Sequence, residues 1–427
     1  MNKFFDTIRE MRGYLVLWLT QALSHLGSSM TSFALIVWSY QAEGSALSTA
    51  LLSVCSYAPY VLLSVFAGAL SDRWNKKATL IVCDALAAVS TVTVLLLLHF
   101  DALRIWHLYV INAVNGLMNT VQQPAGEVAV SLLTPKKHYQ RAGSLQQLSN
   151  SITTIATPAL AAALFALAGL KIVLIVDLAT FVLAAASLLF FIKLPEAPAA
   201  EKKEKLWTAV KGGLEFLNKN RGILMLILFL AGINLIASIY NAALPALVLN
   251  KADEVGYGIL NTATGVAMLA GSLLSTLMPD TKKRARMVCN TLLISMSTEN
   301  FFLALGNSVP VWCIGAVCGW LVIPIMNANL GALMRSNIPV ELQGRVYSVR
   351  NTLQFFTIPL GYLVGGALVD RVFEPFMAQQ AAGGLLVKLF GTGMGSGAAL
   401  LYFCIALAGT AICLYFRTNK HIRAMDE

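Results

Sequence analysis

Twelve long apolar segments follow one another along this chain of 427 residues, and short polar stretches separate them. A helix needs about 20 residues to cross the hydrocarbon core of a bilayer, which is about 30 Å thick. Each segment is long enough to do so. The sequence therefore predicts an all-α, polytopic membrane protein whose spans cover residues 14–40, 47–71, 78–99, 104–132, 140–168, 172–192, 222–249, 256–278, 286–306, 310–334, 344–370 and 397–416.

Composition separates this chain from soluble proteins and from nucleic-acid-binding proteins. Apolar residues make up 57% of the chain and charged residues only 12%, which is about half the charged share of an average soluble domain. The formal net charge is +10, but nearly all of the cations lie in the connections between the apolar segments. We therefore expect the chain to contact a lipid bilayer and no nucleic acid.

Alternate connections differ sharply in positive charge. If the N-terminus is cytoplasmic, 26 of the 31 Lys and Arg residues fall on the cytoplasmic side. The connections on the other side contain only Arg104, Lys171, Lys251, Arg371 and Lys388. Cytoplasmic loops are enriched in Lys and Arg in this way, so the pattern predicts twelve spans with both termini in the cytoplasm.

The longest cytoplasmic connection, residues 194–221, divides the chain into two halves of six spans. We expect an N-terminal bundle at residues 1–193 and a C-terminal bundle at residues 222–427. The connection begins with a stretch rich in Pro, Ala, Glu and Lys, which suits a linker. Its second part carries apolar residues on one helical face and charged residues elsewhere, which predicts a helix lying on the membrane surface.

A repeat relates the two halves. Pro135 and Arg141 lie at the start of the fifth span, and Pro339 and Arg345 lie at the start of the eleventh, so that both pairs are offset by 204 residues. Many secondary transporters are built from two like halves, with a binding site at the repeat interface near the middle of the membrane. The repeat is therefore typical of a transporter.

The connection between the second and third spans, residues 68–77, reads Gly-Ala-Leu-Ser-Asp-Arg-Trp-Asn-Lys-Lys. It resembles the signature loop of the major facilitator superfamily of transporters, Gly-x-x-x-Asp-Arg-x-Gly-Arg-Arg. The matching residues are Gly68, Asp72, Arg73, Lys76 and Lys77. Asn75 takes the place of a glycine of the family, and this departure is mild because asparagine tolerates the left-handed backbone conformation better than most residues.

The resemblance implies two pseudo-symmetric six-helix bundles that rock about a central cavity. It also implies that the signature loop holds the cytoplasmic side shut, together with Glu127 in the fourth span and Arg345 at the start of the eleventh. For Glu127, which lies close to the cytoplasmic end of its span, a structural ion pair with the cations of the loop is the favoured interpretation.

Residues 337–346, Asn-Ile-Pro-Val-Glu-Leu-Gln-Gly-Arg-Val, resemble a loop of the macrolide-efflux branch of the drug:proton antiporters, and so do residues 122–125. This resemblance implies multidrug or macrolide export, and hence antibiotic resistance, at the bacterial plasma membrane with protons as the coupling ion. Asn115 stands where such antiporters often carry an arginine, and residues 156–159 lack their glycines. Because Asn115 replaces this arginine, the sequence leaves open whether transport is coupled to protons.

The resemblance places the first, fourth, seventh and tenth spans around the cavity, and this chain carries its richest polar stripes there. Polar side chains are costly in a bilayer and tend to face a cavity or another helix. Our candidates for the cavity lining are Gln21, Ser24, His25, Ser28, Asn112, Asn115, Asn119, Asn234, Asn241 and Asn327. The alternative is that these side chains join helices through interhelical hydrogen bonds.

Four carboxylates lie within spans, and ionisable groups in such positions often form proton relays. The candidates for proton coupling are Asp84, Glu127, Asp177, Glu299 and His25, the last because imidazole titrates near neutral pH. The family pattern places Asp84 and Asp177 outside the cavity wall, which favours a role in helix packing, and Glu299 is also peripheral. A hydrogen-bonded core histidine is the alternative for His25.

The sequence lacks the motifs that would indicate an enzyme or a metal site. The sequence has no Gly-x-x-x-x-Gly-Lys-Ser/Thr and no His-Glu-x-x-His, so we expect no enzyme, cofactor or metal site. The seven cysteines lie in or near spans without a Cys-x-x-Cys pair, which argues against disulfides and zinc. The glycine-rich residues 391–397 favour a flexible hinge. Gly-x-x-x-Gly pairs at 315–319 and 361–365 favour packing inside the bundle and a monomer.

The sequence thus predicts a secondary active transporter that exports bulky, partly apolar small molecules. A cavity rich in amides and hydroxyls suits a neutral or weakly charged substrate with many hydrogen-bonding groups. One alternative is a dedicated exporter or importer of an endogenous metabolite such as a siderophore. Another is a non-transporting membrane receptor or scaffold.

Overall fold

The computed structural model describes residues 9–73, 75–135, 138–192, 194, 206–278, 281, 283–381 and 383–426. These residues are almost entirely helical, and no strand occurs among them, so the predicted all-α class is confirmed. Helices suit this sequence because in a bilayer every backbone N–H and C=O must find its partner within the chain.

The chain divides into two compact units. Unit 1 comprises Met1–Ser39 and Cys55–Lys202, and unit 2 comprises Tyr40–Val54 and Lys203–Glu427. The segment Tyr40–Val54, which joins two helices of the N-terminal part, thus belongs to unit 2. The bounds expected from the sequence assign this exchanged segment to the N-terminal bundle, and they stay a prediction.

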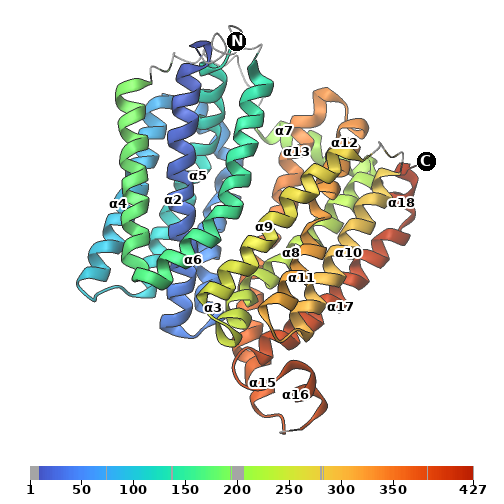
Figure 1. Cartoon of the computed structure of the whole chain (residues 1–427). Helices are drawn as coiled ribbons and strands as arrows, with labels where there is room; N and C mark the ends of the chain where they lie inside the picture. Colours follow the sequence, from blue (N-terminus) through green and yellow to red (C-terminus); the bar gives the residue numbers. More distant parts are fainter. Residues whose placement is uncertain are drawn as a thin grey trace. The chain divides into compact units, whose positions relative to one another are not determined.

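Unit 1 is built from five long helices, the first two of which extend into the exchanged segment (Figure 1). They are α2 (Arg12–Glu43), α3 (Ala46–Arg73), α4 (Lys76–His99), α5 (Ile105–Leu133) and α6 (Tyr139–Ala186), and the π-helix η2 (Ser187–Phe191) continues α6. Gly169 interrupts α6 with φ 70° and ψ −170°, a conformation that glycine adopts readily. The interruption falls between the predicted fifth and sixth spans.

Asn75 lies in the turn before α4 and caps this helix. This residue has φ −63° and ψ 119°, and its side chain accepts a hydrogen bond from the backbone N–H of Ala78 at 3.1 Å. Asn75 is therefore an N-cap and not a left-handed residue. The reason is that its amide oxygen satisfies one of the free N–H groups at the start of α4.

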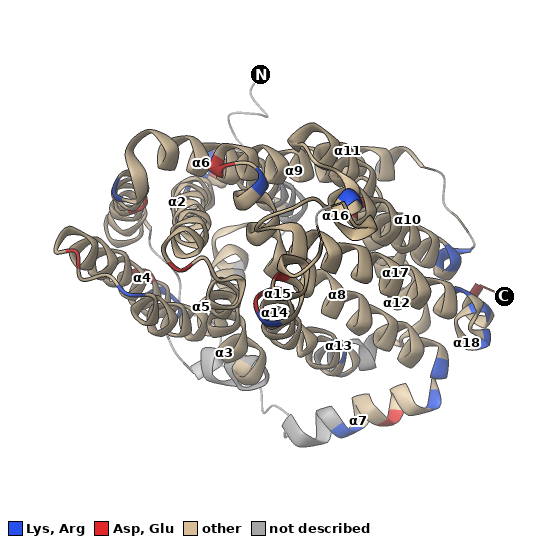
Figure 2. Ribbon diagram, turned by 90° about the horizontal axis from the view of Figure 1, so that it is seen from below, with Lys and Arg blue, Asp and Glu red and all other residues tan. Residues whose placement is uncertain are grey.

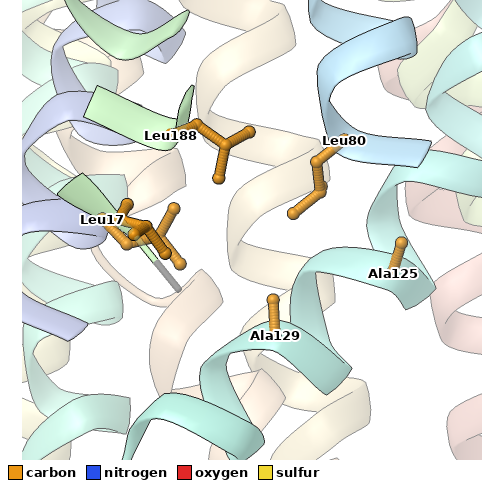
Figure 3. Packing of buried hydrophobic residues seen from close by; sticks show 6 residues of the cluster. Leu17, Leu80, Ala125, Ala129 and Leu188 are labelled. Carbon is orange, nitrogen blue, oxygen red and sulfur yellow. The ribbon is translucent and has the colours of Figure 1, made fainter. Parts of the chain in front are cut away.

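Apolar side chains from α2, α4, α5 and η2 form a buried cluster in unit 1 (Figure 3). Its members are Leu17, Leu80, Ala125, Ala129, Leu188 and Ile192. The two alanines keep the facing surface of α5 small, so that the leucines of the neighbouring helices meet over it. This cluster ties together the helices that carry the candidate site.

Unit 2 contains the remaining helices. They are α7 (Leu206–Lys219), α8 (Arg221–Lys251), α9 (Glu254–Leu277), α10 (Arg284–Leu305), α11 (Val309–Trp320), α12 (Ile323–Asn337), α13 (Val340–Phe355), α14 (Thr357–Leu368), η3 (Val369–Phe373), α15 (Glu374–Ala378), α16 (Leu385–Phe390), α17 (Ser396–Thr418), α18 (Lys420–Arg423) and η4 (Ala424–Asp426). Figure 2 shows charged residues along α7 and at α18, and few along α8 and α17.

Both Gly-x-x-x-Gly pairs serve close helix packing inside unit 2. A Cβ on Gly319 of α11 would lie 2.7 Å from the Cβ of Glu299 on α10, and one on Gly365 of α14 would lie 2.8 Å from the Cα of Ile239 on α8. Only a residue without a side chain permits such an approach.

The glycine-rich residues 391–397 form a turn before α17, and the flexible hinge expected from composition stays a prediction. Gly391, Gly393 and Gly395 all have positive φ, between 79° and 90°. Glu374 Oε1 then accepts hydrogen bonds from the backbone N–H groups of Gly395 and Ala398, each at 3.0 Å. The carboxylate thereby holds the start of α17 in place.

Within the described residues, nine helical segments are long and apolar enough to cross a membrane. One of them, residues 148–191, is 44 residues long and contains the break at Gly169. Many of their large apolar side chains are exposed, for example Leu167 at 83% and Phe190 at 80%, as expected of surfaces that face lipid. The number of twelve spans and the cytoplasmic position of both termini remain predictions.

Candidate functional site

Two adjoining cavities lie among the helices of unit 1. The smaller has a volume of about 220 Å³ and the larger about 960 Å³. They share five lining residues, Gln21, His25, Ser56, Asn119 and Gln122. Pockets for drug-sized ligands measure about 300–1,000 Å³, so the larger cavity has the size of such a site and the smaller one does not.

The polar stripes of α2 and α5 form much of the smaller cavity. Seven of the predicted lining residues meet there: Gln21, Ser24, His25, Ser28, Asn112, Asn115 and Asn119. Their spacing of three or four residues places each group on one face of its helix. Some of them also join neighbouring helices, since Ser90 Oγ of α4 donates to Asn115 Oδ1 of α5 at 3.3 Å.

Asp84 on α4 links three helices at the smaller cavity. Its Oδ1 accepts a hydrogen bond from Nε2 of Gln122 on α5 at 2.6 Å, and its Oδ2 accepts one from Nε2 of Gln21 on α2 at 3.0 Å. The residue is only 8% exposed. Both oxygens are therefore held by amide N–H groups in a nearly closed environment.

Asp177 on α6 is bound by hydroxyl groups alone. Oδ1 accepts from Ser28 Oγ at 3.0 Å. Oδ2 accepts from Thr31 Oγ1 at 3.1 Å and from Thr91 Oγ1 at 2.9 Å. These contacts join α2, α4 and α6 around one carboxylate, so Asp177 does pack helices together.

Both Asp84 and Asp177 line the smaller cavity of unit 1, and whether they lie outside the wall of the central cavity between the two halves stays a prediction. Asp177 reaches this cavity because α6 approaches α2 closely at Gly27, where a Cβ would lie 3.1 Å from the Cα of Asp177. With no side chain between the two helices, the carboxylate of Asp177 reaches the polar face of α2.

Aromatic and amide side chains line the larger cavity. The aromatic residues are Tyr14, Trp18, Tyr57 and Tyr60, and amides include Gln123, Gln146 and Asn150. Two of the aromatic polar groups bind backbone carbonyls of α6, since Tyr14 Oη donates to Ala142 at 2.8 Å and Trp18 Nε1 donates to Leu145 at 2.9 Å. These bonds fix the orientation of both rings.

Sequence analysis did not single out this aromatic group. The signal was present, because Tyr14, Trp18, Gln21 and His25 follow one another at helical spacing. Tyr and Trp also occur on lipid-facing surfaces near membrane interfaces, however, so aromatic residues in a span indicate a cavity only when a polar stripe continues the same face.

Neither cavity lining includes a Lys or Arg among the residues that the structure describes. The carboxylates at the smaller cavity are held by neutral donors only. In the same described part of the chain, no group of three His, Cys, Asp or Glu side chains is arranged to hold a metal ion.

The signature-loop residues are described only in part. The side chains of Gly68, Asp72, Arg73, Glu127 and Arg345 lie outside the described part of the structure. Lys76, at the start of α4, is only 7% exposed.

Lys77 of the same loop binds the end of a helix. Its Nζ donates to the carbonyl oxygen of Ile192 at 2.7 Å and more weakly to that of Leu189 at 3.4 Å. A cation at a helix C-terminus is favourable, so Lys77 anchors the end of η2 to α4.

The candidates for the cavity lining that lie in unit 2 are more dispersed than those in unit 1. Asn234 Nδ2 donates to the carbonyl of Gln354 on α13 at 3.1 Å, and Asn241 Nδ2 donates to the carbonyl of Ala237 on its own helix at 2.8 Å. Asn327 on α12 is exposed. None of the three asparagines lines either cavity of unit 1.

Glu299 on α10 is 2% exposed and is held by two aromatic donors. Its Oε1 accepts from Tyr240 Oη and from Trp320 Nε1, each at 2.6 Å. Tyr402 Oη donates in turn to the carbonyl oxygen of Tyr240 at 2.7 Å. Like Asp84 and Asp177, this carboxylate accepts these hydrogen bonds from neutral groups.

Comparison with known families decides the class of this helical protein. The model of the Major Facilitator Superfamily matches residues 17–362. The chain belongs to the Major Facilitator Superfamily. Membership in the superfamily makes it a transporter and not an enzyme, and a multi-pass protein of the plasma membrane.

Individual members of the superfamily are similar at low identity. Macrolide efflux protein A of Streptococcus pyogenes is 23% identical over 368 residues, which cover 84% of this chain and 90% of that protein. The enterobactin exporter EntS of Shigella boydii is 25% identical over 338 residues, 75% of this chain and 76% of that exporter.

The solved structure of the nucleoside transporter NupG has a TM-score of 0.65 at 13% identity and covers 94% of this chain and 97% of its own. This likeness confirms the superfamily fold. The predicted fold class is therefore confirmed by the helices and by the comparisons together.

Proposed function

We propose that this transporter exports bulky, partly apolar small molecules by alternating access and couples export to protons. The larger cavity of unit 1 carries the proposal. A volume of about 960 Å³ with four aromatic and several amide side chains offers both ring faces and hydrogen-bonding groups. Such a lining suits a large, mainly uncharged molecule, because apolar walls bind it and a few polar groups orient it.

The relatives support export. Macrolide efflux protein A is similar over most of both chains, and its name describes removal of a bulky compound. Coupling to protons draws support from buried carboxylates bound by neutral donors, Asp84, Asp177 and Glu299, since such groups in membranes commonly serve proton relays. His25 and Glu127 remain proposed alternatives for this role.

In this proposal each domain keeps its predicted bounds, residues 1–193 and 222–427, with residues 194–221 as a linker at the membrane surface. Asp72, Arg73, Glu127 and Arg345 close the cytoplasmic side, and Asn234, Asn241 and Asn327 contribute to the cavity from the C-terminal half. The transporter acts as a monomer.

A second candidate function is the export of an endogenous metabolite such as a siderophore. The similarity to an enterobactin exporter favours it. The amide-rich part of the larger cavity would serve a ligand with many hydroxyl and carbonyl groups equally well.

The test is transport by the purified protein in liposomes, using a macrolide, a fluorescent drug and a catechol siderophore, with and without an imposed pH gradient. Gradient-dependent movement of the macrolide or drug supports proton-coupled export. Movement of the siderophore alone supports the second function. If the purified protein moves none of the three compounds, both functions are wrong.

A further inference from the structure

The chain after α17 turns back across one end of unit 2 as a strap, residues 419–426. Its helix α18 packs against α8, α10 and α17. Ile422 is only 2% exposed and anchors the strap. A Cβ on Gly222, at the start of α8, would lie 2.8 Å from the carbonyl oxygen of His421, so no side chain separates the strap from this helix.

The far end of the strap is fixed as well. Asp426 accepts hydrogen bonds from the backbone N–H groups of Ala285 at 2.7 Å and Arg286 at 2.8 Å. It thereby caps the start of α10, where a carboxylate is favourable. Because the helix engages this negative charge, the strap keeps a fixed position on unit 2.

Exposed cations surround the strap. They come from the first residues of α8 and α10, from the end of α17 and from α18, and Figure 2 shows Lys and Arg residues at α18. Within the described part of the chain, none of these cations takes part in an ion pair. This basic surface consists of Arg221, Arg286, Arg417, Lys420 and Arg423.

One arginine of the basic surface is held in a defined orientation. Arg423 Nε donates to the carbonyl oxygen of Arg417 at 3.1 Å, which places the guanidinium group of Arg423 at the end of α17. Its two terminal nitrogens have no hydrogen-bond partner among the residues that the structure describes. A guanidinium group presents its N–H groups in a fork that matches two oxygens of a phosphate, so Arg423 is oriented to bind an anionic group.

The level of the basic surface in a bilayer follows from α17. This helix, like α8 and α10, is long and apolar enough to cross a membrane. Tyr415, near its end, is 65% exposed, and tyrosine favours the interface between membrane and water. Arg417 follows two residues later, about 3 Å further along the helix axis. The basic surface therefore lies at the level of the lipid head groups.

We propose that the basic surface binds an anionic phospholipid, with the guanidinium groups of Arg417 and Arg423 on the phosphate of one head group. The lipid belongs to the leaflet that the charge pattern predicts to be cytoplasmic, where anionic lipids attract Lys and Arg residues beside membrane spans. The surface shares no residue with the lining of either cavity of unit 1. The inference therefore goes beyond the proposed export function and does not depend on it.

The experiment titrates the purified full-length protein in detergent with phosphatidylglycerol and with phosphatidylcholine of the same acyl chains. Native mass spectrometry counts the bound lipids. Each Lys or Arg near an anionic surface contributes a factor of about five to binding. The wild-type protein should therefore prefer phosphatidylglycerol by about twenty-five-fold. The double variant Arg417→Gln/Arg423→Gln should lose this preference and bind phosphatidylcholine as the wild type does.

Arg371→Gln/Lys388→Gln is the matched control, because it removes two exposed cations of unit 2 that lie outside the basic surface. It changes the net charge by the same amount and should keep the preference. Arg221→Gln/Lys420→Gln keeps the test open if the first variant does not fold, since neither of these side chains makes a described hydrogen bond. It should weaken binding of phosphatidylglycerol by at least about fivefold.

Three results would overturn the proposal. The first is equal binding of the two lipids to the wild type. The second is an equal loss of the preference in the control and in Arg417→Gln/Arg423→Gln, or no loss in either. The third is displacement of phosphatidylglycerol by inorganic phosphate at constant ionic strength, because the surface would then bind free phosphate and not a lipid.

Discussion

Ser45 donates a hydrogen bond from Oγ to Oδ2 of Asp370 at 2.6 Å, although 325 positions separate the two residues in the chain. The same carboxylate accepts from the backbone N–H groups of Ala46 at 2.9 Å and Leu47 at 2.8 Å. Asp370 of η3 thus caps the first turn of α3, as a carboxylate at a helix N-terminus does favourably. Gly366 permits the contact, since a Cβ there would lie 2.6 Å from the Cα of Leu47.

The first prediction concerns this cap. Asp370→Ala should lower the free energy of unfolding of the detergent-purified protein by about 2 kcal/mol, because it removes a cap together with charge-assisted hydrogen bonds. Thermal unfolding measures the change. Glu43→Ala, which removes an exposed carboxylate near the same helix end, should have little effect, and equal losses in both variants would contradict the capping role.

The second prediction concerns the aromatic wall of the larger cavity. Trp18→Ala should weaken binding of a bulky ligand by about tenfold, since an aromatic contact contributes about 0.5–1.5 kcal/mol beyond the burial of its area. Trp106 on the same unit is 58% exposed and lines neither cavity, so Trp106→Ala is the matched control. The two variants are compared by ligand titration of the purified proteins. Equal affinities would exclude Trp18 from the site.

The third prediction concerns the approach of α2 to α6. Gly27→Leu should destabilise unit 1 by about 3 kcal/mol or prevent its folding, because a side chain at this position meets the backbone and carboxylate of Asp177 and overpacked cores are costly. Gly232→Ala on α8 has its nearest neighbour at 3.9 Å and should be tolerated. Thermal unfolding in detergent distinguishes the two, and tolerance of leucine at Gly27 would show that α2 and α6 are not in close contact.

The fourth prediction concerns Glu299. If this carboxylate carries the transported proton, Glu299→Gln should reduce accumulation driven by a pH gradient by at least about tenfold, because an amide cannot exchange a proton at this site. Substrate exchange without a gradient should continue, since glutamine can still accept from Tyr240 and Trp320. Unchanged accumulation would assign coupling to another of the candidates. Proteoliposome assays of both modes provide the measurement.

The sequence predicted the helices well because hydrophobic length is a local property. Each of the predicted spans begins or ends within a few residues of a helix boundary. The break in α6 at Gly169 falls where the fifth and sixth spans were expected to meet. The polar stripes of α2 and α5 could also be predicted from the sequence, since helical spacing alone brings Gln21 and His25 to one face of α2.

The positions of Asp84 and Asp177 could not be predicted in the same way. They depend on how closely α4 and α6 approach α2, and the approach of α6 is permitted by Gly27 on α2 and not by the helix that carries Asp177. The hydrogen-bond partners of Lys77 could not be predicted from the sequence either. Its two carbonyl partners lie more than a hundred positions away, and no local pattern connects them.

The long-range cap on α3 also has a consequence for biogenesis. When Ser45 leaves the ribosome, Asp370 has not yet been synthesised, so the connection between α2 and α3 lacks this hydrogen-bond acceptor for most of translation. A fragment that ends at Lys202 would insert with this connection permanently unpaired. We therefore expect that the N-terminal half matures only in the presence of the C-terminal half, whether the two are made as one polypeptide or as separate ones.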